Sequence, residues 1–76
     1  MQFEFIEQSQ LQDGTHRFIL KVEPASQVLF GFLLESFDGL FNYTTIDEKN
    51  ALLQVDFLNV SYEDGARILE FMKEWE

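Results

Sequence analysis

The single histidine, His16, is the first residue to consider as a catalytic group. An imidazole acts as a general base when a nucleophile and an orienting acid lie within hydrogen-bonding reach. His16 stands beside Arg17 at the start of a predicted strand, and no recognisable spacing brings a nucleophile and an acid to it. We therefore expect a structural or solvent-exposed histidine, and we predict that the protein is not an enzyme.

Two acidic pairs, Asp47-Glu48 and Glu63-Asp64, are the candidates for a cation site. A calcium-binding loop needs oxygen ligands at alternate positions, a central glycine and a terminal glutamate, and no segment fits that pattern. Asp47-Glu48 is typical of a turn, and Glu63-Asp64 of the first turn of a helix, where the dipole favours acids. The sequence predicts no metal site.

The four glycines make no phosphate-binding loop. Gly14 and Gly39 are expected in turns. Gly31 and Gly65 fall inside predicted helices, where glycine costs about 1 kcal/mol relative to alanine. Close packing of another element against the helix explains them better than a bound ligand does. We therefore expect no cofactor.

The charge balance disfavours two classes of partner. Fourteen acidic residues against five basic ones give a net charge of −9. Nucleic acids and anionic membrane surfaces are both bound through clustered cations. The sequence therefore predicts neither nucleic-acid nor membrane binding.

Size and composition predict one compact domain over residues 1–76. Hydrophobic residues make up 46% of the chain, and nine phenylalanines supply a core without cysteines or disulfides. No apolar run approaches the roughly 18–20 residues of a membrane span. The first residues, MQFEFIEQ, lack the basic start and apolar run of a signal peptide, so we expect a cytoplasmic protein.

Apolar residues alternate in four segments, around residues 2–6, 17–22, 40–46 and 52–57, which predicts four strands. For the first two strands we expect Phe5 opposite Phe18 and Phe3 opposite Leu20, because this pairing keeps the apolar faces together. Residues 47–50 form a short hairpin loop.

Two helices complete the pattern. The first is opened by Glu23-Pro24 and closed by Asp38-Gly39. The second is capped by Ser61 and has an apolar stripe of Ile68, Leu69, Met72 and Trp75.

The order ββαββα predicts an α+β fold: a circularly permuted ferredoxin-like plait. Its four-stranded antiparallel sheet has the order 1-2-4-3, with two helices on one face. We expect the following side chains to form the core: Phe18, Leu20, Val22, Leu53, Val55 and Phe57 from the strands, and Val28, Leu29, Phe32, Leu33, Ile68, Leu69 and Met72 from the helices.

From residue 16 to the C-terminus, the chain resembles a family of short bacterial proteins known only as a domain of unknown function. The matching segments are Lys21-Val22-Glu23-Pro24, Phe37-Asp38-Gly39-Leu40 and Thr45-Ile46-Asp47. They are structural turns, and the resemblance implies no activity. In architecture alone, the chain is also similar to ACT-like regulatory domains.

The first helix, from Ala25 to Phe37, carries more apolar residues than one core needs. With Val28, Leu29, Phe32 and Leu33 assigned to the core, three further residues widen the apolar arc: Phe30, Leu34 and Phe37. Two explanations stay open. These three residues form a surface for a partner or a second copy, or they fill the groove beside the second helix at Phe71 and Trp75.

Two classes of function follow from these patterns. The first is a non-catalytic interaction module that self-associates through the first helix, as a homodimer, or that binds another protein. The alternative is an ACT-like regulatory domain that senses a small metabolite.

Overall fold

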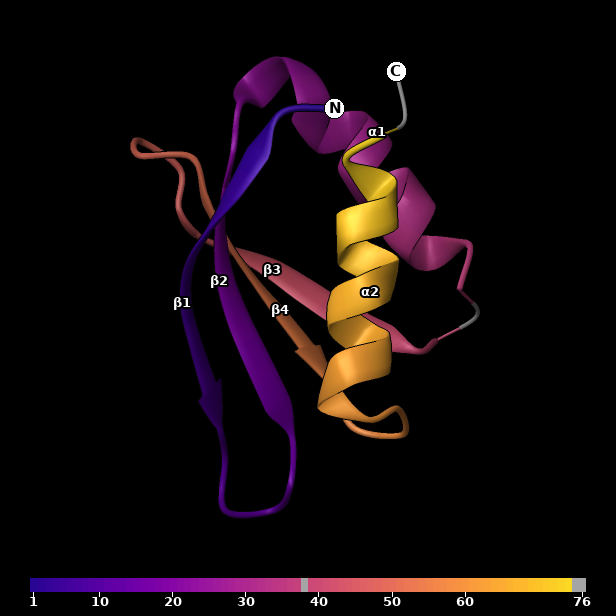
Figure 1. Ribbon diagram of the computed structural model, residues 1–76. Helices are drawn as coiled ribbons and strands as arrows, with labels where there is room; N and C mark the ends of the chain where they lie inside the picture. The colour runs from indigo at the N-terminus through magenta and orange to yellow at the C-terminus, as the bar shows by residue number, and fades with distance from the viewer. Residues whose placement is uncertain (38, 75–76) are drawn as a thin grey trace.

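In the computed structural model, which describes residues 1–37 and 39–74, six elements follow in the order ββαββα. The strands are β1 (Phe3–Gln10), β2 (His16–Val22), β3 (Phe41–Asp47) and β4 (Leu52–Phe57), and the helices are α1 (Pro24–Glu35) and α2 (Tyr62–Met72). The sheet is antiparallel with the order β1-β2-β4-β3. Both helices lie on one side of it (Figure 1). The predicted permuted ferredoxin-like plait is thus confirmed.

The alternation in β2 and β4 produces one fully buried face. All six strand residues expected in the core are at most 3% exposed. The open face carries mostly polar side chains, with Ile19 and Leu52 among them, and Arg17 of β2 pairs there with Asp56 of β4. Two hydrogen bonds of 2.9 Å join the guanidinium to the carboxylate and raise the pKa of Arg17. The sheet therefore has one apolar face under the helices and one face in water.

The predicted register of β1 against β2 is wrong by two residues. Phe3 lies opposite Val22 and Phe5 opposite Leu20, and a β-bulge between Phe5 and Glu7 shifts the pairing beyond that point. The bulge adds one residue to β1. It lets the strand keep Phe3 and Phe5 on the core side and still reach a compact loop, closed by a 2.8 Å bond from the amide of Leu11 to the carbonyl of Thr15.

The loops follow the expected turn chemistry. Asp47 accepts hydrogen bonds from the side chain and the backbone amide of Asn50, which lower the pKa of its carboxyl group. Gly14 and Gly39 have positive φ angles, of 93° and 83°. Helix α1 ends at Glu35, two residues earlier than expected, so Gly39 belongs to the turn that follows. The predicted closing residue Asp38 lies outside the described residues.

Helix α2 packs as its sequence predicts. The Ser61 hydroxyl accepts a 3.2 Å bond from the amide of Asp64, and Leu69 and Met72 are buried. Ile68 is half-buried against the core, while Trp75 lies outside the described residues. Gly65 lies on the Phe57 ring so closely that a Cβ atom would overlap it. The close packing expected at the helical glycines is confirmed here.

Helix α1 does not pack as predicted. Val28 and Phe32, expected in the core, are 84% and 68% exposed, and Leu29 and Leu33 are only half-buried. The helix turns a different face to the sheet, with Phe30, Gly31 and Leu34 buried. We call these three residues the inner face of α1. The prediction failed because both arcs of this helix are apolar, so the pattern alone does not distinguish them.

Candidate interaction surface

The residues predicted to form an interface lie largely inside the monomer. Phe30 and Leu34 are fully buried, and the Phe30 ring contacts the Phe3 ring of β1 at 5.3 Å between centroids. Phe37 is half-buried, 5.8 Å from the ring of Phe41. The structure corrects the assignment of Phe30 and Leu34 to a contact surface: these side chains complete the core above the sheet.

The excess of apolar residues on α1 instead faces solvent. Val28 and Phe32 lie one helical turn apart and are the two most exposed large hydrophobic side chains of the described residues. Ala25 is exposed and Leu29 half-buried. The spacing i, i+3, i+4, i+7 places Ala25, Val28, Leu29 and Phe32 on one stripe. We call this stripe the outer face of α1.

The outer face of α1 continues towards strand β3. At 100° per residue, the order around the helix from Phe30 is Leu34, Gly31, Pro24, Glu35, Val28 and Phe32. A Cβ atom on Gly31 would lie 2.5 Å from the Tyr43 hydroxyl, so the Tyr43 side chain of β3 reaches the helix at Gly31. Tyr43 is itself 39% exposed. The apolar side chains of Val28 and Phe32 therefore lie on the same side of α1 as Gly31 and Tyr43, with the exposed Glu35 between them.

A polar hollow of about 270 Å³ lies near the loop that joins β1 and β2. It is lined by Gln8, Ser9, Gln10, His16 and Tyr62. The Tyr62 hydroxyl hydrogen-bonds the Gln8 side chain, and the His16 ring packs against Phe57 and Tyr62, at 5.2 and 6.0 Å between centroids. No carboxylate lines this hollow to orient the imidazole. His16 is half-buried among aromatic rings, which is a structural position.

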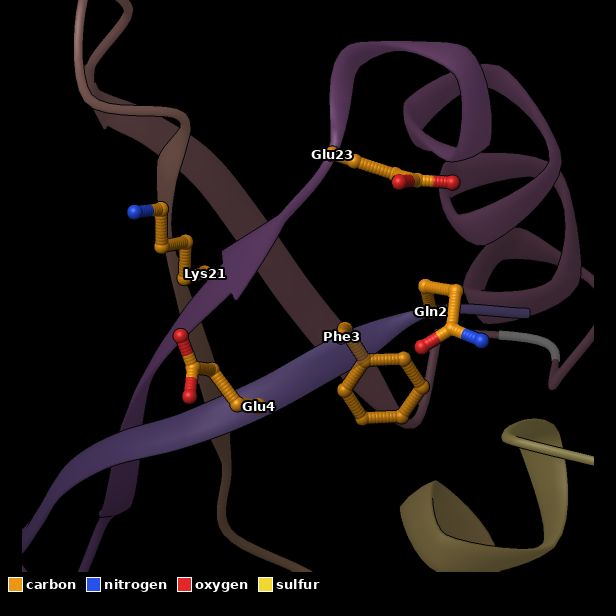
Figure 2. A pocket seen from close by; sticks show the side chains of 5 residues that line it. All are labelled: Gln2, Phe3, Glu4, Lys21 and Glu23. Atoms are coloured by element: carbon orange, nitrogen blue, oxygen red, sulfur yellow. The ribbon is translucent and has the colours of Figure 1, made fainter.

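A second hollow, of about 260 Å³, lies where β1 and β2 meet the start of α1 (Figure 2). Its lining side chains do not converge on one point: the Lys21 amine and the Glu23 carboxylate extend away from each other. Residues of opposite charge line it, yet they do not enclose a ligand-sized volume from several sides. This hollow does not have the geometry of a binding site.

The acidic residues that the structure describes lie apart from one another or are engaged by neighbouring groups. Within residues 1–37 and 39–74, no three His, Asp or Glu side chains gather closely enough to hold a metal ion. Asp47 is engaged by Asn50, and Asp13 accepts a 2.9 Å bond from the amide of Thr15 that lowers its carboxyl pKa. The Asp64 amide donates to the Ser61 hydroxyl that caps α2, and the Asp64 carboxylate lies 3.5 Å from the Arg67 guanidinium.

Neither helix in the part of the chain that the structure describes has the length and apolar character that a membrane crossing requires. Fold and surface together define a small α+β plait whose main unexplained feature is an exposed apolar helix face.

A family model described as a domain of unknown function, DUF4911, matches residues 20–74, and the chain belongs to this family. This confirms the resemblance seen in the sequence, and the family's description indicates no catalytic activity. Searches of curated proteins and of solved structures found no match.

Proposed function

We propose that this protein is a non-catalytic interaction module that pairs with a second copy of itself through the outer face of α1. The observation that carries the proposal is the exposure of Val28 and Phe32, at 84% and 68%, on one stripe of one helix. Single exposed hydrophobic residues are common, but a contiguous apolar stripe on a small protein is typical of a contact surface.

The charge of the chain restricts where a second copy can bind. Two copies with a net charge of −9 repel each other, and this repulsion is smallest when the facing surfaces carry few charges. Ala25, Val28, Leu29 and Phe32 carry no charge, and Glu35, one turn beyond Phe32, is the one charged residue of α1. A two-fold axis buries the same apolar stripe twice, and two-fold dimers are the commonest assembly of identical chains.

Sedimentation equilibrium of the wild type and of Phe32→Lys tests the proposal. The added lysine changes the net charge from −9 to −8, so weaker association cannot come from greater overall repulsion. We expect a wild-type dimer and a Phe32→Lys monomer with an unchanged circular dichroism spectrum.

Phe71→Lys is the matched control, because Phe71 is an aromatic residue on α2 with 55% exposure. This variant should stay dimeric. A monomeric wild type would contradict the proposal, and so would equal dissociation of the two variants.

The second candidate function is the sensing of a small metabolite, as in ACT-like domains. The polar hollow at Gln8, His16 and Tyr62 favours it, because amide, imidazole and hydroxyl groups face a common space. The Tyr62 hydroxyl already donates a hydrogen bond to the Gln8 side chain, however, so fewer of their polar groups are left to bind a ligand. A thermal-shift screen with amino acids and nucleotides separates the two functions. A bound metabolite raises the melting temperature of a sensor, whereas none of these compounds raises that of an interaction module.

A further inference from the structure

The two edges of the sheet differ in how they are protected. An edge strand exposes a row of unpaired backbone amides and carbonyls, and proteins protect such rows with charged side chains, proline or bulges. Strand β1 carries Glu4 and Glu7, and its bulge lies between Phe5 and Glu7 near the middle of the strand. This edge resists the addition of another strand.

Strand β3 lacks these protections. Its first six residues, 41–46, read FNYTTI and contain no charge, proline or glycine. Aromatic and β-branched residues of this kind favour extended backbone, and an uncharged six-residue segment of them is typical of strands that pair. Residues 42–46 are all exposed, and the bulge of β3 lies only at its end, between Thr45 and Asp47.

We propose that β3 pairs in antiparallel orientation with β3 of a second copy, which joins two four-stranded sheets into one continuous sheet across a two-fold axis. The inference rests on the self-association proposed above and adds the backbone contact through which it occurs. Antiparallel pairing suits a second copy, because a strand turned by a two-fold axis offers its own donors and acceptors in matching order.

The area that a stable dimer needs supports this site. A standard interface covers about 800 Å² on each partner, whereas even an aromatic side chain buries only about 150–250 Å². Val28 and Phe32 together therefore supply less than about 500 Å². The exposed row of β3 adds to this area, including Tyr43 and Ile46 at 39% and 48% exposure.

One axis can bury both surfaces, because they are neighbours. Tyr43 of β3 meets α1 at Gly31, and Val28 lies about 60° further around the helix, beyond the exposed Glu35. Strand β3 forms the sheet edge opposite β1, and α1 leads from the end of β2 to the segment before β3 (Figure 1). A copy placed along β3 therefore brings its own α1 towards the outer face of α1.

Thr44→Lys tests the strand contact, with Gln54→Lys as its matched control. Thr44 on β3 and Gln54 on β4 are register partners on the open face, and each substitution changes the net charge from −9 to −8. A lysine protects an edge strand and has no such effect on a central one. We expect Thr44→Lys to weaken the dimer at least about tenfold and Gln54→Lys to leave its Kd within about twofold.

Amide hydrogen exchange of the wild type gives a second measurement that needs no variant. Amides of β3 should gain protection as protein concentration rises, while those of β1 stay unchanged. A dimer that Phe32→Lys dissociates but Thr44→Lys does not, with no concentration-dependent protection in β3, would overturn this inference and leave the helix contact standing. A monomeric wild type would overturn both.

Discussion

Helices α1 and α2 cover the same sheet but differ in the polarity of the side that faces away from it. The outer side of α2 is mostly polar, with Glu63, Asp64, Arg67 and Glu70 beside the exposed Tyr62 and Phe71. Both sides of α1 are apolar, and Glu35 at its end is its one charged residue. A helix that only covers a core needs one apolar stripe, as α2 has. The second stripe of α1 is the surface that the proposed dimer would bury.

The largest expected effect separates the two faces of α1. Phe30→Ala should lower the free energy of unfolding by about 3–5 kcal/mol, because it empties a fully buried site. Val28→Ala should change it by less than about 0.5 kcal/mol, because Val28 is 84% exposed. Urea denaturation at a dilution where the protein is monomeric measures both. Comparable losses in the two variants would mean that the faces are assigned incorrectly.

The helical glycines should show an intermediate difference. A methyl group at Gly65 overlaps the Phe57 ring, which is 2% exposed and enclosed by the core. Gly65→Ala should therefore cost about 1–3 kcal/mol. At Gly31 the methyl group meets the hydroxyl end of Tyr43, which is partly exposed and free to turn aside.

Gly31→Ala should consequently cost less than Gly65→Ala, since alanine also gains about 1 kcal/mol in helix propensity. Thermal melts of the two variants, run side by side, measure the difference. The opposite ranking would indicate that Tyr43 is held rigidly under α1.

The smallest expected effect concerns the two helix starts. Ser61 caps α2 through its side chain, whereas Glu23 precedes α1 without a side-chain bond to the helix backbone. Ser61→Ala should cost about 1 kcal/mol, and Glu23→Ala less than about 0.5 kcal/mol. Chemical denaturation followed by circular dichroism resolves the two values. An equal loss at Glu23 would show that its contact with Ser26 contributes to the start of α1.

The sequence by itself determined the elements, their order and the buried face of the central strands. Alternation with a period of two leaves only two choices of face for a strand, and in β2 and β4 one of them is clearly more apolar. Local chemistry also determined the cap at Ser61 and the turn at Asp47, because their hydrogen bonds join residues three apart.

Only the tertiary structure decided which side of α1 faces the sheet. Phe30 and Leu34 on one arc and Val28 and Phe32 on the other are equally apolar, so burial depends on which arc fits against Phe3 and Tyr43. The sequence pattern did not predict the bulge in β1 either. The bulge depends on both the register of β1 against β2 and the length of the loop between them. Both are questions of fit between segments distant in the chain, which a local pattern does not contain.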